Sequence, residues 1–330
     1  MDTMVSFGFK SQYQMKKVLV DGVFIHNSGS KLILEIIIER AKKDYDKVVL
    51  LRDNRLVYAE KESLKEIEIN GIFRVVIAAL YRMIGYDIIG VNSLGCLIPG
   101  IYKWVYFHNA TLLEKSSTDF LRFNYFKFSS RIVSTFLVQT EHMRFKLLER
   151  GVKNVQVLPL FDLVSFKDLP LESARNDYMY IGAYYPHKNV ELLLEGWFRF
   201  KDKYELDSIL YLTLDNMDFS RLIDSRKAEC YDVHNLGWLP KKDLLKECKK
   251  VKNFINLSSI ESFGLPYLEV GAMYERRMMS LRLAHLDDIV SGLLYVDNNV
   301  ESVSHGLNEL LHTDVITNIK IVDQRQNLFK

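Results

Sequence analysis

Short runs rich in β-branched and aromatic residues alternate with longer amphipathic stretches along the whole chain of 330 residues. The β-rich runs of the first half are KKVLVDG, DKVVLLRD, DIIGVNS, WVYFHN, STFLVQT and NVQVLPL, and those of the second half are YMYIGA, SILYLTL, VHNLGWL, NFINLSS and RMMSLRL. Helical patterns lie between several of them, for example at 31–43, 141–150, 190–204 and 241–250. This alternation predicts an α/β protein with parallel sheets and right-handed crossovers.

The length of the chain favours two domains. A single hydrophobic core stops growing near ~250–300 residues, and the alternation occurs in two successive sets. The polar stretch 162–177, which contains Pro170, separates them. We therefore expect two doubly wound, Rossmann-like domains, 1–165 and 166–330. Ligands of such folds bind beyond the carboxyl ends of the strands, which predicts a ligand in a cleft between two facing domains.

Composition excludes several other classes of protein. A chain with 48% hydrophobic and 26% charged residues is typical of a folded protein rather than a disordered one. Its three cysteines are far apart, so neither a disulfide framework nor a zinc spacing is available, and a reducing, cytoplasmic compartment is favoured. The first 17 residues lack the apolar core of a secretory signal. The longest apolar region, 83–107, is interrupted by polar residues, which predicts two buried strands and a loop rather than a membrane span.

The segment ESFGLPYLE places a carboxylate on each side of a Phe-Gly-Leu-Pro turn, at Glu261 and Glu269. It follows an apolar run, and Pro266 suits the first turn of a helix. Glu261 is thus expected in the strand-to-helix loop and Glu269 about one turn into the helix. The amide groups of such a helix start suit a diphosphate, and carboxylates accept hydrogen bonds from sugar hydroxyls. The same spacing also fits an ordinary helix start with acidic residues near its positive end.

A second segment, YIGAYYPHKNVELLLEGW, begins with an apolar strand that ends at Gly182. A loop follows, and Lys188 stands just before the next helix. A lysine in this position can neutralise a departing phosphate. Taken alone the pattern is weak, because most loop lysines are simply solvated.

In this order, the two segments together resemble the retaining glycosyltransferases of the GT-B fold, in particular family 4 and its relatives, the group 1 glycosyl transferases. Gly182 with PHKN is similar to the family's strand–glycine–loop–lysine segment, and ESFGLPYLE is similar to its Glu-x7-Glu segment. The strong resemblance covers about 178–311, whereas the first half matches in its alternation alone. The family places an arginine just after the strand glycine, where this chain has Ala183 and Tyr184.

The resemblance implies a reaction that keeps the anomeric configuration of the donor sugar. Lys188 would stabilise the leaving nucleoside diphosphate, which is the type of interaction that contributes most to catalysis in many enzymes. Glu261 would position the transferred sugar, and Glu269 would hold the ribose. The remaining donor-binding residues would be Gly182, Phe263, Gly264, Leu265 and Gly29.

Two loops of the first half are further candidates. His108, in VYFHNA, follows a predicted strand, and the family often has a histidine near the sugar. A lone histidine is otherwise more often structural. His26 and Gly29, in FIHNSGS, lie in a small polar loop where a glycine allows close approach of the backbone to a diphosphate.

Metal and other cofactors are not expected. The Asp-x-Asp sequence at 44–46 precedes a predicted strand, whereas metal-dependent glycosyltransferases of the other fold place theirs after one. No His/Cys cluster has zinc spacing. A serine hydrolase is not supported, because no G-x-S-x-G sequence occurs.

The stretch FLRFNYFKFSSR, at 120–131, interleaves aromatic and basic residues, and residues 1–165 carry 23 Lys and Arg against 17 Asp and Glu. These features fit contact with an anionic membrane surface. The stretch fits equally well an amphipathic helix that packs in the core with a basic outer face. No nucleic-acid-binding motif accompanies it.

The function predicted from these patterns is that of a cytoplasmic, hexosyltransferase-type enzyme, peripheral at the inner membrane face. It would move a sugar from a nucleotide-sugar donor to a glycan acceptor, lipid-linked as in surface polysaccharide, lipopolysaccharide or O-antigen synthesis. Two alternatives remain open. A nucleotide-sugar epimerase of the same fold would need no acceptor, and a non-catalytic assembly partner would only bind the nucleotide sugar, an alternative that Ala183 keeps open.

Overall fold

A computed structural model describes residues 15–25, 28–56, 64–93, 95, 98–113, 120–160, 175–273, 275–283 and 285–320. These residues form two parallel sheets, and the chain divides into two compact units. One unit holds most residues up to Phe107 together with Asn124–Leu137, and the other holds His108–Phe123 and most residues after Val138. Most of the stretch that was expected to separate two domains, 162–174, lies outside the described residues, so that boundary stays a prediction.

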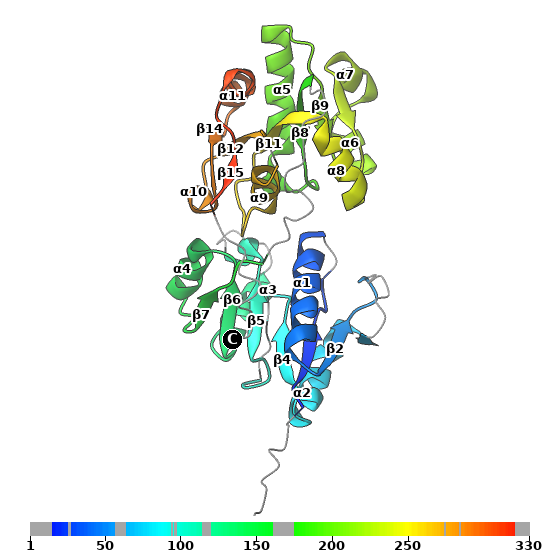
Figure 1. Ribbon diagram of the computed structural model, residues 1–330, viewed down its shortest axis with the longest axis vertical. Helices are drawn as coiled ribbons and strands as arrows, with labels where there is room; N and C mark the ends of the chain where they lie inside the picture. Colours follow the sequence, from blue (N-terminus) through cyan, green and yellow to red (C-terminus); the bar gives the residue numbers. More distant parts are fainter. Residues whose placement is uncertain are drawn as a thin grey trace, which may run out of the picture. The chain divides into compact units, whose positions relative to one another are not determined.

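The first sheet has the strand order β3-β2-β1-β4-β5-β6-β7 (Figure 1). The pairs from β3 across to β5 run parallel. The central strands are apolar and almost entirely buried, as expected for a parallel sheet that is covered on both faces. The strands are β1 (Lys17–Asp21), β2 (Lys47–Arg52), β3 (Lys65–Glu68), β4 (Asp87–Gly90), β5 (Trp104–Phe107), β6 (Thr135–Val138) and β7 (Val155–Val157).

Helices connect the strands of the first sheet: α1 (Ser28–Asp44), η1 (Gly71–Phe73), α2 (Arg74–Met83), η2 (Ala110–Leu113), α3 (Phe120–Ser129) and α4 (Glu141–Glu149). The helices expected at 31–43 and 141–150 are confirmed. The apolar region 83–107 contains two buried strands, β4 and β5, as predicted. α4 begins after Thr140, whose side chain accepts a hydrogen bond from the Met143 amide at 3.2 Å.

The second sheet has the order β10-β9-β8-β11-β12-β14, and all five neighbouring pairs run parallel. A short antiparallel pair, β13 with β15, stands beside it. The strands are β8 (Arg175–Tyr180), β9 (Leu210–Leu212), β10 (Val233–Asn235), β11 (Val251–Asn256), β12 (Arg277–Leu281), β13 (Val290–Ser291), β14 (Leu293–Val296) and β15 (Asn318–Ile319).

The helices of this second part are η3 (Pro186–Lys188), α5 (Val190–Tyr204), α6 (Asn216–Leu222), α7 (Ser225–Cys230), α8 (Lys241–Lys249), α9 (Leu265–Gly271), α10 (Leu286–Ile289) and α11 (Val300–His312). The predicted helices at 190–204 and 241–250 are confirmed as α5 and α8. α5 and α11 pack side by side, as Figure 1 shows. They approach closely at Gly196, where a Cβ atom would overlap the side chain of Val303.

Two hydrophobic clusters cover the two faces of the second sheet. Tyr178 and Tyr180 of β8 belong to the cluster beneath α5 and α11, whereas Met179 between them belongs to the cluster beneath α8, α9 and α10. Successive side chains of a strand point to opposite faces, so helices cover both sides of this sheet. The second part is therefore doubly wound, as the sequence predicts.

The strand order reverses between β1 and β4 in the first sheet and between β8 and β11 in the second. In open α/β sheets, ligands bind outside the carboxyl ends of the strands at such points. Among the described residues, no helix is both long and apolar enough to cross a membrane.

Candidate functional site

Two loops leave the carboxyl ends of β8 and β11, the neighbouring strands at the reversal point of the second sheet. We call residues 181–189 the lysine loop and residues 257–264 the glutamate loop. The first leads into α5 and the second into α9. Because the two strands are hydrogen-bonded neighbours, loops from the same edge come close together even though they are far apart in sequence.

The lysine loop is held by contacts from both sides. The amide of Gly182 donates to Oγ1 of Thr213 at 3.0 Å, and the hydroxyl of Tyr180 donates to the carbonyl of Ala183 at 3.2 Å. The loop then makes the single turn η3 and ends at Asn189, which adopts the left-handed conformation with φ +51°. Asparagine tolerates this region better than most residues. The loop is thus shaped by specific hydrogen bonds.

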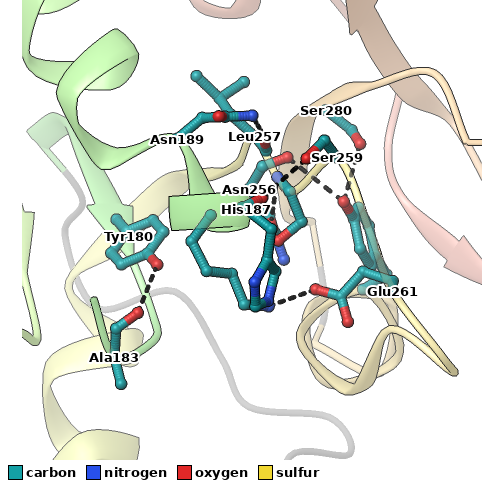
Figure 2. Close-up of polar contacts among 12 residues, drawn as sticks. Tyr180, Ala183, His187, Asn189, Asn256, Leu257, Ser259, Glu261 and Ser280 are labelled. Atoms are coloured by element: carbon teal, nitrogen blue, oxygen red, sulfur yellow. Dashed lines mark hydrogen bonds and ion pairs between the residues drawn. The ribbon is translucent and has the colours of Figure 1, made fainter. Parts of the chain in front are cut away.

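Hydrogen bonds join the lysine loop to the glutamate loop. The amide of Ser259 donates to the carbonyl of His187 at 2.8 Å, and the side-chain amide of Asn189 donates to the carbonyl of Leu257, also at 2.8 Å. Figure 2 shows Ser259 and Glu261 beside the turn that carries His187. The two loops therefore form one polar unit.

Lys188 and Glu261 form an ion pair across this unit, between Nζ and Oε1. Their side chains are 17% and 11% exposed, so the pair lies just beneath the surface. An ammonium group has three donors and a carboxylate has two acceptor oxygens. Within the part of the chain that the structure describes, this contact is the one hydrogen bond found for either charged group. Both partners therefore keep capacity for ligand oxygens and hydroxyls.

His187, beside the ion pair, is held in its neutral form. Partial burial lowers the pKa of His187, and the neighbouring Lys188 ammonium lowers it further, against the opposing effect of Glu261. Its ring stacks on Tyr185 with the centroids 5.7 Å apart. A neutral His187 adds no positive charge next to Lys188, so the cation of this site is the lysine.

The glutamate loop turns into α9 at Gly264, whose φ of +75° lies in the left-handed region. A Cβ atom at Gly264 would approach the ring of Tyr267 to 2.7 Å, so both the backbone and the packing require glycine here. Tyr267 is fully buried, and its hydroxyl contacts the carbonyl of Asn256 at 3.3 Å and Oγ of Ser280 at 2.9 Å. The buried, hydrogen-bonded Tyr267 thus packs against the turn at Gly264 and stabilises it.

The start of α9 matches the sequence prediction. Pro266 stands in its first turn, and the carbonyl of Gly264 accepts from the amides of Tyr267 and Leu268. The amide groups ahead of the helical ladder, among them those of Gly264 and Leu265, have no partner within the helix. Glu269 lies in α9, half-buried, one turn after its start. The predicted positions of both glutamates are therefore confirmed.

The other predicted site residues lie in different surroundings. The side chain of Phe263 is buried in the hydrophobic cluster beneath α9. His108 directly follows β5. Gly29, expected in a loop, lies instead in the first turn of α1, which follows β1, so that part of the prediction is wrong. Both residues belong to the connections of the first sheet. His26 lies outside the described residues. The roles of these residues stay predictions.

Several residues that hold the site were not predicted. Asn189 could have been suspected, because asparagine before a helix is compatible with a left-handed turn. Thr213 follows β9 and fixes Gly182, but a single threonine after a strand carries no specific signal. Leu257 acts through its backbone carbonyl, which the residue type does not reveal. Ser259 donates to the carbonyl of His187 from both its amide and its hydroxyl, but a single serine in a loop carries no specific signal.

Within the described residues, no three His, Cys, Asp or Glu side chains come together in a way that could hold a metal ion. The expectation that the reaction needs no metal stays a prediction.

Several solved structures with a similar fold are named as glycosyltransferases. The chain is similar to WaaG, a glycosyltransferase involved in lipopolysaccharide biosynthesis, with a TM-score of 0.70 and 12% identity over 90% of this chain and 91% of the other. It is similar to the lipopolysaccharide outer core galactosyltransferase WaaB (TM-score 0.65, 14% identity, 91% of both chains). It is also similar to HepE from Anabaena in complex with UDP and glucose (TM-score 0.64, 13% identity, 90% and 89%).

No protein-family model and no curated protein sequence matches the chain. The structural likeness extends over about nine-tenths of the chain and of each of these three structures, so it covers both doubly wound parts. At 12–14% identity it establishes architecture rather than substrate. The chain has the GT-B fold of the group 1-like glycosyltransferases.

Proposed function

We propose that the protein is a retaining glycosyltransferase that transfers a sugar from a nucleotide-sugar donor to a glycan acceptor. The observation that carries the proposal is the ion pair of Lys188 and Glu261 on two hydrogen-bonded loops at the β8–β11 reversal point. A cation and a carboxylate with unused hydrogen-bonding capacity match the two halves of such a donor. The diphosphate needs the cation, and the sugar hydroxyls need the acceptor oxygens.

The donor and acceptor classes are supported by the structural neighbours. HepE was solved with UDP and glucose, and the names of WaaG and WaaB refer to lipopolysaccharide biosynthesis and to the lipopolysaccharide outer core. We therefore propose a nucleoside-diphosphate sugar as donor. The proposed acceptor is a glycan, lipid-linked, of a surface polysaccharide such as lipopolysaccharide or O-antigen.

Each predicted residue has a role in this proposal. Lys188 and the amides of Gly264 and Leu265 bind the diphosphate, where negative charge grows as the bond to the sugar breaks. Glu261 orients Lys188 and accepts hydrogen bonds from the sugar. Glu269 accepts hydrogen bonds from the ribose hydroxyls. The remaining contacts to the donor come from Gly182, the backbone of Phe263, Gly29 and His108.

The reaction exchanges one bond at the anomeric carbon for another. The acceptor hydroxyl oxygen forms a bond to the anomeric carbon on the face from which the diphosphate leaves. The bond between that carbon and the diphosphate oxygen breaks, and its electron pair stays with the nucleoside diphosphate. The proton of the acceptor hydroxyl passes to the leaving phosphate oxygen. The product keeps the anomeric configuration, and no metal or other cofactor is required.

One experiment separates the transferase from its two alternatives. The purified protein is incubated with a panel of UDP-, GDP- and ADP-sugars, with and without glycan acceptors, and the products are followed by NMR. A transferase yields a glycoside with the donor's anomeric configuration, and chelator leaves the rate unchanged. An epimerase converts or releases the sugar without acceptor. Nucleotide binding with no turnover would support the non-catalytic assembly partner. That alternative is considered because Ala183 stands where the family has an arginine. An inverted linkage would contradict the retaining mechanism.

We also propose a cytoplasmic enzyme with peripheral contact to an anionic membrane. Lys127 and Phe128 in α3 are exposed, the latter by 60%. In α2 and its flanks, a series of apolar residues at helical spacing is more than half exposed: Phe73, Val76, Leu80, Met83 and Ile84. Exposed apolar residues next to cations support binding at a lipid interface. Co-sedimentation with anionic vesicles at low salt tests this, and a wild-type protein that stays in the supernatant would contradict it.

A further inference from the structure

A cavity of about 460 Å³ lies at the carboxyl ends of β1, β2 and β3 in the first sheet. Small-molecule sites typically occupy about 300–1,000 Å³. Its lining comes from the turn after β1, the turn after β2 and the segment around the end of β3, and includes Phe24, Asp53, Arg55, Glu68 and Gly71. We call it the Phe24 pocket. These residues are separate from the Lys188–Glu261 site.

Phe24 has a backbone conformation that bulky residues rarely adopt. Its φ is +73°, in the left-handed region that favours glycine. The side chain is nevertheless 41% exposed, so burial in the core does not compensate for the strain. Strained residues persist where the surrounding structure fixes them, and they cluster at ligand sites. The strain holds an aromatic ring at the wall of a cavity.

Asp53 is the group that fixes this turn. Its Oδ2 accepts from the amide of Phe24 at 3.0 Å and from the guanidinium of Arg55 at 2.6 Å, and its Oδ1 accepts from the amide of Arg55 at 3.1 Å. Burial alone would raise the pKa of Asp53, but these hydrogen bonds outweigh burial and lower the pKa. The carboxylate is therefore ionised at neutral pH, and three of its roughly four acceptor positions are occupied.

Two cations also lie over the ring of Phe24. The guanidinium carbons of Arg55 and Arg74 each lie 5.6 Å from its centroid, within cation–π range. Gly71 lies against the ring edge, because a Cβ atom built there would be 2.6 Å from the ring. Gly71 thus leaves the space that the ring occupies. The ring of Phe24, on which a ligand could pack, is therefore held in position before any ligand binds.

The charges of the pocket indicate what kind of ligand fits. Arg55 is paired with Asp53, and Glu68 is paired with Arg52 at 2.8 Å. Among the described lining residues, each charge is thus already paired with an opposite one. The described lining carries two carboxylates, Asp53 and Glu68, against one cation, Arg55, so a phosphate or a carboxylate would meet an excess of negative charge. Hydroxyl groups, in contrast, can donate to carboxylate oxygens while an apolar C–H face packs on the ring of Phe24.

We propose that the Phe24 pocket binds an uncharged sugar residue of the acceptor glycan, with its apolar face on the ring of Phe24 and its hydroxyls toward Asp53 and Glu68. The identification of this sugar as part of the acceptor rests on the proposed function. The binding of a sugar in the pocket does not depend on that function. Gly71 acts as a positioning residue, because it leaves the space that the ring occupies. Asp53 fixes the turn at Phe24 and also accepts from the sugar hydroxyls.

Two variants test the ring of Phe24 in different ways: one removes it and the other displaces it. Phe24→Gly deletes the ring and also relieves the backbone, since glycine accepts a positive φ, so the fold is expected to remain intact. Gly71→Ala keeps the ring but displaces it from its present position. Phe145→Ala is the matched control, because Phe145 is an exposed phenylalanine of α4 outside the pocket.

The test is ligand-observed saturation-transfer NMR with the full chain. The probes are methyl glycosides of glucose, galactose, mannose and N-acetylglucosamine, with methyl glucuronide as the charged counterpart. We expect at least one neutral glycoside to bind the wild type and the Phe145→Ala variant equally. Binding should be about tenfold weaker in Phe24→Gly, the upper end of what an aromatic contact contributes, and also weakened in Gly71→Ala.

A Lys188→Ala variant distinguishes the two sites. The NMR signal of a glycoside bound at the donor site should change in this variant, whereas the signal of a glycoside bound in the Phe24 pocket should not. No binding of any neutral glycoside to the wild type, equal binding by Phe24→Gly, or stronger binding of the glucuronide would overturn the proposal. Hydrolysis of the nucleotide sugar without acceptor, measured in parallel, should be unchanged in Phe24→Gly. Absence of hydrolysis and of transfer in the wild type would count against the proposed function and leave the NMR result standing.

Discussion

The two parallel sheets each carry an ion pair near the carboxyl end of a central strand, and the two pairs differ in how completely they are satisfied. In the first sheet, Asp21 at the end of β1 is paired with Arg74, and their side chains are 0% and 4% exposed. In the second sheet, Lys188 and Glu261 are 17% and 11% exposed. The difference in exposure is modest, but the difference in hydrogen bonding is large.

Asp21 has four donors around its carboxylate. Its Oδ2 accepts from Arg74, Asn92 and Tyr102, and its Oδ1 accepts from the amide of Val23. This fills roughly all acceptor positions of a carboxylate. A saturated, buried pair can fix the fold but has no capacity left for a ligand. The pair of Lys188 and Glu261 has that capacity, which is why we assign it to binding and catalysis.

The largest expected effect follows from breaking the saturated pair. Arg74→Met leaves the carboxylate of Asp21 buried without its cation, which typically costs about 3–5 kcal/mol of stability. The control is Arg82→Met in the same helix, because Arg82 pairs with Asp87 at the surface, where such pairs contribute about 0–1 kcal/mol. Urea unfolding of both variants measures the difference. Equal destabilisation would contradict the structural role of the buried pair.

The next effect distinguishes the two glutamates of the second sheet. Glu261→Gln should lower kcat or change sugar choice, because Glu261 faces Lys188 and the proposed sugar position. Glu269→Gln should mainly weaken binding of the nucleotide, since its proposed role is to hold the ribose. Calorimetric titration with UDP, or with the nucleoside diphosphate of the active donor, together with steady-state kinetics, measures both. Equal weakening of nucleotide binding by the two substitutions would remove this division of roles.

A smaller effect is expected where the two loops are joined. Asn189→Gly keeps the left-handed turn but removes the hydrogen bond to the carbonyl of Leu257. The expected loss of stability is about 1 kcal/mol. Asn189→Ala should lose more, since alanine is strained at this φ. If the two variants unfold at the same urea concentration, backbone strain at Asn189 is not a factor.

The smallest effect concerns the charge beside the site. The ammonium of Lys188 lowers the pKa of His187, in addition to burial, so Lys188→Met should raise that pKa toward its ordinary value. In the wild type, the unfolded chain protonates this histidine at a higher pH than the folded protein. Its contribution therefore lowers stability as the pH falls from about 6.5, and this dependence should weaken in the variant. An NMR titration of His187 with an unchanged or lower pKa would contradict the proximity of the two charges in solution.

Much of this fold could be predicted because its strands are buried on both faces and read as apolar runs. The exception at the edge of the first sheet is instructive. β3, with the sequence KEIE, was not predicted, since it has a single apolar residue, Ile67. It is held to β2 by Arg52, which pairs with Glu66 and Glu68 across the ladder. Pairing that depends on a distant partner leaves no periodic pattern in the strand itself.

The same distinction separates the two candidate sites. Lys188 and Glu261 could be predicted because each follows a recognisable strand and stands in a local motif. The hydrogen bonds that join their loops could not, because they use backbone carbonyls. The Phe24 pocket was missed entirely. It is assembled from the ends of three strands, and Phe24 in the sequence continues the apolar pattern of β1, so its strained, exposed position has no local signal.

The measurement that tests the central assignment most directly is the turnover of Lys188→Ala with the donor that the wild type accepts. If Lys188 meets the charge on the departing diphosphate, kcat should fall by about 10²–10³, as when other catalytic donors of this type are removed. The protein should still unfold cooperatively. Lys242→Ala, an exposed lysine of α8, is the matched control and should retain wild-type turnover. A loss of less than a few-fold in a folded Lys188→Ala variant would remove the ion pair from the reaction and contradict the account.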